Sequence, residues 1–368
     1  MFKEIGGNFW LEPEQLEERE CADLDFRYVN DNEVVVYTSS GRGAISLLLD
    51  QIRITGGALL PLYTCESVIK PFIKKGYDVH FYDINTDLSV NEQSFMECVN
   101  SYKPGVVLLH AYFGFDTLHN LRFKYQWLRE KGIIIIEDIT HSLFSNFEKN
   151  GADYYLASLR KWLALPDGGI AITTRNKIKM ATYTIFATHK KLVNLNIKAI
   201  RLKYEYTKNL DIHLKNEYRK LFYSTEELLN TDYGFYAMSR ISKAVLCQTN
   251  FAILSATRRS NYAYLLNYLT QQSCVEPVFN DYPADVVPFY LSVYVKCDRT
   301  KLSKYLAEAE IYAPILWDIP NACLGQLTHT TSYVYNNILS IPCDQRYTHK
   351  DLERIVIKLS EYTDKMRR

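Results

Sequence analysis

The chain lacks the features that would mark it as a membrane, secreted or nucleic-acid-binding protein. Its longest apolar runs, such as 106–109 and 133–136, are far shorter than the roughly 20 residues that cross a bilayer. Residues 1–13 carry Glu4 and Glu12 where a signal peptide needs an unbroken apolar stretch. Lysine and arginine number 43 against 42 aspartates and glutamates, so no overall charge favours nucleic acid or an anionic membrane. We therefore expect a cytoplasmic protein with no nucleic-acid or membrane partner.

Cysteine pairs at short spacing are also missing. The eight cysteines are scattered between Cys21 and Cys343 and contain no C-x-x-C pair. This pattern argues against a zinc site and against a compact disulfide framework. We expect free thiols in a reducing compartment and no bound metal.

The first half of the chain has the pattern of an α/β domain. With 368 residues, 47% of them hydrophobic, the chain can bury a large core, and its length predicts two domains or one large domain with an appended smaller one. From 33 to about 174, β-branched runs alternate with helical stretches, as in parallel strands joined by crossover helices. The expected strands are 34–37, 58–60, 79–82, 106–109 and 133–136, and the expected helices are 41–51 and 118–131.

The second half has a different character. Residues 177–269 contain almost no Gly or Pro, which predicts a mainly helical linking segment with one break near 231–235. From 275 onward the periodicity predicts a small α+β domain. Its expected strands are 289–295 and 338–342, and its expected helices are 300–310 and 349–364.

Three short segments could carry chemistry, and the first is Ser-Ser-Gly-Arg-Gly-Ala at 39–44. It follows a predicted strand and opens a predicted helix, so free backbone N–H groups at the positive end of the helix could hold a phosphate. Arg42 could add a fixed charge. The spacing is neither a Walker loop nor a dinucleotide turn, so an ordinary helix cap is the competing interpretation.

The second segment is the buried strand that ends in Glu137 and Asp138. Open α/β sheets bind their ligands at the carboxyl ends of their strands. A buried carboxylate at this edge is costly unless it meets a cation, and a protonated pyridine nitrogen is such a cation. The alternative is that Asp138 caps the following helix.

The third segment contains Arg160 and Lys161 between two predicted strands. Most such pairs are solvated surface. Here Trp162, Leu163 and Leu165 flank the pair, so we expect the lysine to be partly desolvated. Desolvation favours the neutral amine that attacks an aldehyde.

These segments occur in the order seen in a known family. The chain resembles the DegT/StrS-type (DegT/DnrJ/EryC1/StrS) sugar aminotransferases, which use pyridoxal 5'-phosphate and have fold type I, the aspartate aminotransferase-like fold. That fold implies a large domain with a mostly parallel, seven-stranded-type sheet flanked by helices, plus a smaller α+β C-terminal domain. The resemblance extends over nearly the whole chain. Its segments are 5–10, 40–45, 60–65, 76–83, 110–114, 137–142, 158–169, 234–266 and 338–342.

The resemblance implies roles for four residues around the cofactor. Lys161 would form the Schiff base, and Asp138 would pair with the pyridine nitrogen. His141 would lie near the phenolic oxygen, and Ser158 near the phosphate or that same oxygen. Lys161, Asp138 and His141 would be the catalytic residues.

The resemblance also implies a phosphate-binding turn and a residue over the cofactor ring. The turn corresponds to Ser40, Gly41 and Arg42. Arg42 stands where the family usually has threonine, which exchanges a hydroxyl donor for a charged fork. The ring would be covered by a residue from the run Tyr63, Thr64 and Cys65. Tyr63 is the first choice because aromatic side chains stack on rings.

Two further departures from the family concern spacing and the neighbouring subunit. Ser158 and Lys161 are three residues apart, whereas five separate the serine and lysine in many relatives. The relatives' Gly-Tyr-Asn-x-Arg-Met segment, whose Asn reaches the phosphate of the neighbouring subunit, appears here at 234–240 without the Asn. Ser239 or Arg240 would then substitute for it in a homodimer.

The expected function is a transamination. An amino acid, glutamate or glutamine, would donate its amino group to a nucleotide-linked keto sugar, in the biosynthesis of cell-surface polysaccharide or glycoconjugates. Two alternatives remain: a sugar dehydratase on the same scaffold, which a lysine at 161 argues against, and a catalytically silent dimeric binding protein. The expected domains are 1–30, which packs with the small domain, 31–250 for the cofactor-binding domain, and 251–368 for the small domain.

Overall fold

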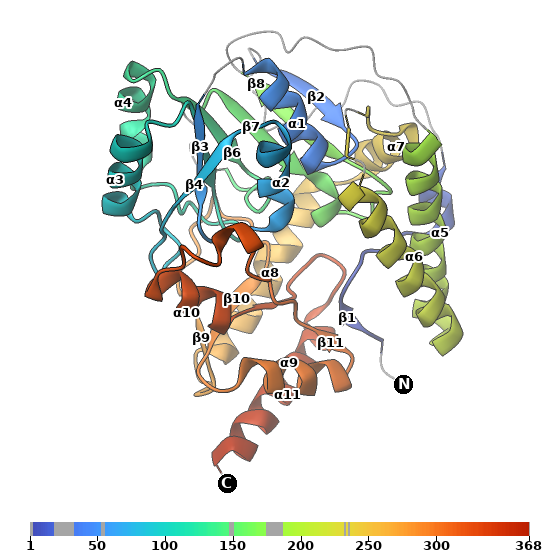
Figure 1. The fold of residues 1–368 in the computed structure, drawn as a ribbon. Coiled ribbons are helices and arrows are strands. Elements are labelled where there is room, and N and C mark those ends of the chain that lie inside the picture. The colour runs from blue at the N-terminus through green and yellow to red at the C-terminus, as the bar shows by residue number, and fades with distance from the viewer. Residues whose placement is uncertain are drawn as a thin grey trace.

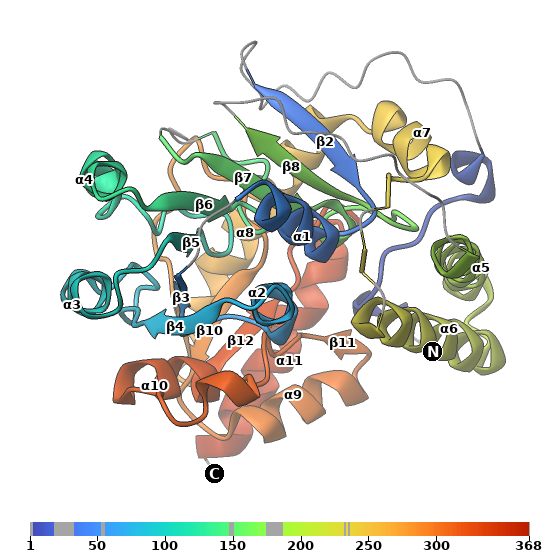
Figure 2. The same cartoon turned by 45° about the horizontal axis from the view of Figure 1, so that its top comes forward.

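In the computed structural model of the chain, the structure describes residues 3–17, 33–52, 56–146, 151–173, 187–231, 233–234 and 236–367. Within these ranges the largest sheet has seven strands, and Figures 1 and 2 show it from two directions. Its strand order is β2-β8-β7-β6-β5-β3-β4. The strands are β2 (Val34–Thr38), β3 (Gly57–Pro61), β4 (Asp78–Tyr82), β5 (Val106–His110), β6 (Ile134–Asp138), β7 (Tyr154–Ser158) and β8 (Gly169–Thr173).

The sheet is mostly parallel, as the sequence predicted. Neighbouring strands from β4 to β7 pair in parallel, while β8 runs antiparallel to both β7 and β2. Every residue of β5 is buried, which explains its unbroken apolar run: both faces of the strand are covered. In the pairing of β5 with β6, His110 lies opposite Asp138 at the carboxyl edge of the sheet.

Helices cover both faces of the sheet. On one face α1 (Gly41–Gln51) and α2 (Glu66–Lys74) pack on alternate strand residues such as Leu60 and Leu108, and the residues between them face the second core. On the other side lie α3 (Glu92–Tyr102) and α4 (Tyr125–Glu130) (Figure 1). The expected helix at 118–131 is shorter in the structure. Tight turns and a 3-10 segment, Arg122–Lys124, precede α4, because Arg122 is held by Asp116 and the buried Glu137.

The helical prediction for the middle of the chain is confirmed where the structure describes it. The helices are α5 (Ala187–Asn209), α6 (Ile212–Thr231), α7 (Arg240–Gln248) and α8 (Phe251–Leu269). Helices α5 and α6 form a long antiparallel hairpin at one side of the molecule (Figure 1). The first ten residues of the predicted segment, 177–186, and residues 232 and 235 of the predicted break lie outside the described residues.

The C-terminal part is an α+β unit, as expected. Strands β9 (Val275–Pro277), β10 (Leu291–Val295) and β12 (Ile338–Ile341) form an antiparallel sheet with the order β12-β10-β9. The accompanying helices are α9 (Arg299–Glu308), α10 (His329–Asn337) and α11 (His349–Arg367). The short strand β1 (Ile5–Gly6) pairs in parallel with β11 (Ile311–Tyr312). The domain boundaries at 30 and 250 stay predictions.

A buried group of charges joins β1, the α5–α6 hairpin and the chain next to β11. Glu4 forms ion pairs with Lys203 and Lys215, and Tyr218 donates a hydrogen bond to the same carboxylate at 2.8 Å. Lys215 also pairs with Glu310. We call these five residues the clasp cluster. The side chains of Glu4, Lys203 and Lys215 are at most 4% exposed, so this cluster holds ionised groups inside the protein.

The cysteines follow the sequence expectation with one correction. The structure has free thiols at Cys65, Cys98, Cys274, Cys297, Cys323 and Cys343. Cys247, however, is in a disulfide, and Cys21 lies outside the described residues. The spacing argument excluded only pairs close in sequence, whereas a disulfide can join distant segments. Among the helices that the structure describes, none is long and apolar enough to cross a membrane.

Candidate active site

Two cavities meet at the carboxyl edge of the large sheet. The smaller, of about 260 Å³, reaches the ends of β5, β6 and β7, and we call it the sheet-edge cavity. The larger, of about 530 Å³, has six Phe, Tyr or Trp side chains among its lining residues, and we call it the aromatic cavity. Both are lined by Asn8, Arg160, Lys161, Glu226 and Trp317, so they share a wall or an opening.

The sheet-edge cavity brings together most of the residues that the sequence singled out. They come from the start of α1, from the start of α2 and from the ends of β6 and β7. Those that line the cavity are Ser40, Gly41, Arg42, Cys65, Asp138, Ser158 and Lys161. Segments more than a hundred residues apart in the chain therefore converge on one site.

Asp138 ends β6 and is buried against the cavity. Its Oδ2 lies 3.5 Å from Nδ1 of His110, and its Oδ1 accepts a hydrogen bond from the backbone N–H of Thr140 at 2.9 Å. Burial alone would raise the pKa of Asp138, but His110 and Thr140 outweigh it and hold the pKa below its ordinary value. The site therefore presents an ionised carboxylate. Nε2 of His110 is buried and has no hydrogen-bond partner among the described residues.

The start of α1 is pressed against the sheet at the cavity. The Ser40 hydroxyl caps the helix by accepting from the backbone N–H of Gly43 at 3.0 Å. A Cβ on Gly169 would lie 2.3 Å from the carbonyl carbon of Ser40, and one on Gly41 would lie 3.1 Å from Cβ of Ser158. Only glycine at 169 lets β8 approach the helix start this closely. Ser40 is therefore a helix cap, as one interpretation of this turn expected. The helix start also lines the sheet-edge cavity, and its role in phosphate binding stays a prediction.

Lys161 lies in the 3-10 turn Leu159–Lys161 that follows β7. Its side chain is half-buried and lines both cavities. Its Nζ lies 5.8 Å from the centre of the Trp317 ring, and no described residue forms an ion pair with it. The tight turn explains the short spacing from Ser158, because both residues still line the sheet-edge cavity.

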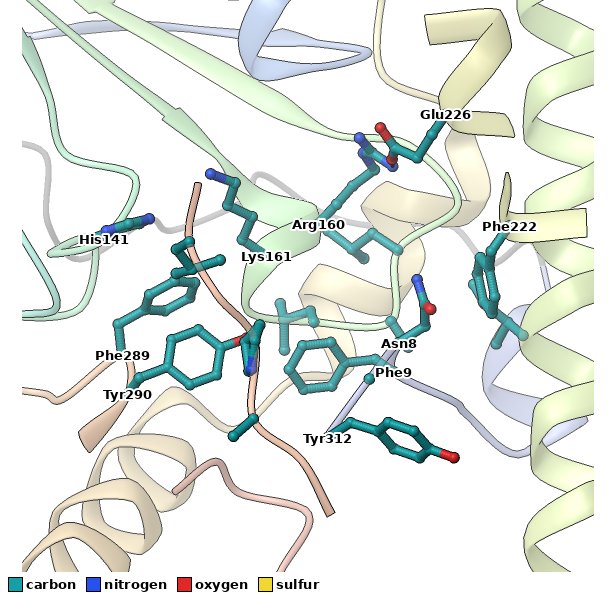
Figure 3. A pocket seen from close by; sticks show the side chains of 18 of the residues that line it. Asn8, Phe9, His141, Arg160, Lys161, Phe222, Glu226, Phe289, Tyr290 and Tyr312 are labelled. Carbon is teal, nitrogen blue, oxygen red and sulfur yellow. Dashed lines mark hydrogen bonds and ion pairs between the residues drawn. The ribbon is translucent and has the colours of Figure 1, made fainter. Parts of the chain in front are cut away.

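Two arginines and one glutamate close one side of the cavities. Arg42 Nη2 lies 3.8 Å from Oε2 of Glu226, and Arg160 Nη1 donates to its Oε1 at 3.2 Å. Figure 3 shows Arg160 and Glu226 in contact, with Lys161 between this pair and His141. Burial alone would raise the pKa of Glu226, but the two guanidinium groups hold it below its ordinary value. Glu226 is therefore ionised.

His141 lines the aromatic cavity rather than the sheet-edge cavity. Its ring stacks between Phe289, at 4.5 Å, and Trp317, at 5.4 Å. It is fully buried, and neither ring nitrogen has a hydrogen-bond partner in the described part of the chain. Burial, with the nearby His110 and Lys161, holds the pKa of His141 well below its ordinary value. The imidazole is neutral and keeps one donor and one acceptor available.

The aromatic cavity is assembled from distant parts of the chain. Figure 3 shows Phe9 and Tyr312 on one side of it, Phe289 and Tyr290 on another, and Phe222 from α6 opposite. Its polar lining residues include Asn8 and Asn196, besides the residues shared with the sheet-edge cavity. The volume falls in the range of small-molecule sites.

Three of the predicted site residues line neither cavity. The Tyr63 side chain is fully buried, packs on Tyr112, Trp317 and Tyr335, and donates its hydroxyl to the carbonyl of Leu316. Thr64 is buried beside it, and its backbone N–H donates to the Tyr335 hydroxyl. Arg240 is exposed at the first position of α7. From the run 63–65, the residue that does line the sheet-edge cavity is Cys65.

Several lining residues escaped the sequence interpretation. Arg160 was named only as the neighbour of Lys161, and His110 only through the segment 110–114 of the family resemblance. Asn8, Glu226 and Trp317 were not singled out, because each comes from a segment whose approach to the sheet edge is set by tertiary structure. Hydrophobic periodicity carries no such information.

The sheet-edge cavity fits pyridoxal phosphate. It offers an amine at Lys161, an ionised carboxylate at Asp138 for a ring nitrogen, and a helix start with Arg42 for a phosphate. The unpartnered Nε2 of His110 is one further polar atom that a ligand could satisfy. Over the described residues, no group of three or more His, Cys, Asp or Glu could hold a metal ion.

Comparison with known proteins identifies the family of the chain. The family model for the DegT/DnrJ/EryC1/StrS aminotransferase family matches residues 18–360. No protein of curated function matches the chain by sequence. Many solved structures share the fold, which confirms the expected fold class.

Three of these structures illustrate the likeness. The sugar aminotransferase CalS13 from Micromonospora echinospora is 15% identical, with a TM-score of 0.64, covering 91% of this chain and 88% of its own. PseC of Helicobacter pylori, an aminotransferase involved in the biosynthesis of pseudoaminic acid, is 11% identical, with a TM-score of 0.67 and coverage of 90% and 87%. Spr1654 from Streptococcus pneumoniae, in its PLP form, is 13% identical, with a TM-score of 0.64 and coverage of 90% and 87%. The matched family model extends over most of the sequence, so the chain belongs to the DegT/DnrJ/EryC1/StrS aminotransferase family, whose members use pyridoxal phosphate.

Proposed function

We propose that this chain transfers an amino group from glutamate or glutamine to a nucleotide-linked keto sugar, in the biosynthesis of cell-surface polysaccharide or glycoconjugates. The observation that carries the proposal is that Lys161 and Asp138 line one cavity at the sheet edge, which borders a second cavity large enough for a substrate. Family membership and the similarity to sugar aminotransferases such as CalS13 support the choice of a sugar acceptor. The specific sugar is not part of the proposal.

The cofactor would be held by residues of the sheet-edge cavity. Lys161 would bind its aldehyde carbon, and the ionised carboxylate of Asp138 would keep its ring nitrogen protonated. Bound pyridoxal phosphate supplies an electron sink for negative charge that develops on the substrate carbon. Asp138 is suited to this task because it is already ionised in its buried position.

Two further groups would act on the substrates. Once the amino group of the donor has displaced Lys161 from the aldehyde carbon, the freed Nζ, which faces both cavities, would take the proton from the α-carbon of the donor. Neutral His141 would lie beside the cofactor and offer one hydrogen bond to its phenolic oxygen or to the substrate. The aromatic side chains around His141 would exclude water from the reacting atoms and pack against the sugar ring.

We propose in addition that the protein is a cytoplasmic homodimer. The family resemblance implies that neighbouring subunits complete each other's sites. Arg240 supports this idea, because it is exposed in a single chain and lies outside the cavities of its own subunit. It would be available to a second subunit.

The direct test locates the cofactor on the chain. The purified protein would be loaded with pyridoxal phosphate, reduced with borohydride and digested, and the modified peptide would be identified by mass spectrometry. We expect the label on Lys161, and we expect Lys161→Ala to lose it together with the visible absorbance band. Lys198→Ala, at a lysine whose side chain is 58% exposed, should keep both.

The same material separates the competing functions. With glutamate, an aminotransferase converts its bound cofactor to the amine form, which changes the absorbance. Protein that stays colourless in saturating pyridoxal phosphate, or a label on another lysine, would overturn the proposal. A colourless protein would favour a silent binding protein instead.

A further inference from the structure

The three charged residues between the two cavities form a group with an unusual composition. Arg42 comes from the first turn of α1, Arg160 from the turn before Lys161, and Glu226 from α6. All three line the sheet-edge cavity. We call them the gate cluster.

The gate cluster carries an excess of positive charge. Glu226 lies 3.8 Å from Arg42 and 3.2 Å from Arg160, so one carboxylate serves two guanidinium groups. The arginine side chains are only 16% and 21% exposed, which makes water a poor substitute partner. The start of α1 adds positive potential to the same cavity, which also holds the ionised carboxylate of Asp138. An anion beside the two arginines would neutralise the positive charge that Glu226 leaves uncompensated.

The chemistry of the two arginines selects a phosphate. A guanidinium group presents a planar fork of N–H donors that matches phosphate oxygens, and two forks beside a helix start can bind several of them. Glu226 forms ion pairs with both guanidinium groups. A phosphate that enters the cavity must therefore displace the Glu226 carboxylate or share the arginine N–H donors with it. The Glu226 side chain is 52% exposed, so it can turn away toward solvent at little cost.

We propose that Arg42 and Arg160 bind the phosphate of the cofactor within one chain, and that Glu226 is an internal anion with which this phosphate competes. The inference rests on the proposed function, because it takes pyridoxal phosphate as the ligand of the sheet-edge cavity. It gives Arg160 a ligand role and accounts for the absent Asn in the segment 234–240. The two arginines add phosphate contacts from the same chain, beside those that a neighbouring subunit would offer in the proposed homodimer.

The proposal predicts opposite effects from two substitutions in one ion pair. Arg160→Gln removes a donor and should weaken binding of pyridoxal phosphate by about 10-fold or more, the scale of one charge-assisted hydrogen bond. Glu226→Gln removes the competing charge and should tighten binding by about 3- to 10-fold. If the ion pair were only structural, both Arg160→Gln and Glu226→Gln would weaken the binding of pyridoxal phosphate.

The experiment compares two ligands that differ only in the phosphate. Dissociation constants of pyridoxal phosphate and of pyridoxal would be measured by absorbance for the wild type, Arg42→Gln, Arg160→Gln and Glu226→Gln. We expect changes for pyridoxal phosphate and nearly constant values for pyridoxal. Inorganic phosphate should compete with pyridoxal phosphate at a lower concentration in Glu226→Gln than in the wild type.

Two controls distinguish a loss of phosphate binding from a loss of folding or of the bond to Lys161. Thermal unfolding would be recorded for each variant, and Arg160→Lys, which keeps the charge but loses the fork, should bind with intermediate affinity. Equal weakening of both ligands in Arg160→Gln, or weaker binding of pyridoxal phosphate by Glu226→Gln, would overturn the inference while Lys161 still carries the cofactor. A wild type that binds no pyridoxal phosphate at Lys161 would instead defeat the proposed function.

Discussion

Two buried groups of charges in this molecule are built in opposite ways. In the clasp cluster every charged group has a partner: Glu4 lies between Lys203 and Lys215, and Lys215 also reaches Glu310. At the sheet edge the partners are incomplete, since Lys161 has no ion pair among the described residues and both nitrogens of His141 lack a hydrogen bond within the same part of the chain. A cluster in which every charged group has a partner stabilises the fold. A site in which polar groups lack partners is suited to bind a ligand.

The difference follows from the cost of burying charge. A buried polar group without a hydrogen-bond partner lowers the free energy of unfolding by about 1 to 3 kcal/mol. Such groups are concentrated at functional sites, where a bound ligand can supply the missing partner. The clasp cluster needs no ligand, because its carboxylates and ammonium groups form ion pairs with one another. Substitutions in the two places should therefore separate stability from activity.

The largest effect should come from breaking the clasp cluster. Glu4→Gln leaves Lys203 without a countercharge and should lower the free energy of unfolding by about 3 kcal/mol. Urea unfolding followed by circular dichroism would measure the loss. Pyridoxal phosphate binding by the folded protein should change little, because Glu4 lines neither cavity.

A matched control is available on the same helical hairpin. Glu217 on α6 pairs with Lys198 on α5 at 2.7 Å, but both side chains are about half exposed. Glu217→Gln should cost less than about 1 kcal/mol, because water screens an exposed pair. Equal losses in Glu217→Gln and Glu4→Gln would show that burial does not distinguish the two pairs.

The second effect should appear at the sheet edge with the opposite signature. Asp138→Asn keeps an oxygen that can accept from the Thr140 N–H but removes the charge facing the ring nitrogen of the cofactor. We expect the transamination rate to fall by about 100-fold or more, the usual scale for a lost electrostatic partner. The free energy of unfolding should change by less than about 1 kcal/mol, because a buried charge is also removed. If Asp138→Asn instead lost much stability and kept a normal transamination rate, Asp138 would support the fold rather than the reaction.

The smallest expected effect concerns acid. Burial alone would raise the pKa of Glu4, but Lys203, Tyr218 and Lys215 hold it below the ordinary 4.5. The ionised form then contributes stability above pH 4.5, and this contribution is lost as the pH falls through the lower folded value. The gap in unfolding free energy between wild type and Glu4→Gln should therefore shrink by about 1 kcal/mol between pH 6 and pH 4. A gap that is constant or grows toward acid would contradict this assignment.

Helices and strands with a regular pattern of apolar residues could be predicted from the sequence. The strand predicted at 106–109 is β5, the helix predicted at 41–51 is α1, and both have apolar residues at the spacing of their structure. The positions of Asp138 and Lys161 were accessible for a similar reason, because Asp138 ends a buried strand and Lys161 lies in the turn that follows another. Both therefore lie at the sheet edge.

The rest of the site depends on contacts that no local pattern records. Trp317 follows β11 in a segment without regular structure, and Glu226 lies on α6, whose position is set by the clasp cluster. Tyr63 shows the limit of a chemical preference: stacking favoured it for the ring face, yet neighbouring rings enclose it and Cys65 faces the cavity instead.

The pairing of β1 with β11 has a consequence for biosynthesis. Gly6 donates its backbone N–H to the hydroxyl of Tyr347, 341 residues later, and Asn8 and Phe9 follow directly into the cavity wall. On the ribosome, β1 must wait for a partner that is translated 306 residues later, since Ile5 pairs with Ile311. A nascent chain can fold its central sheet first, but it gains a complete substrate cavity only after β11 has been translated.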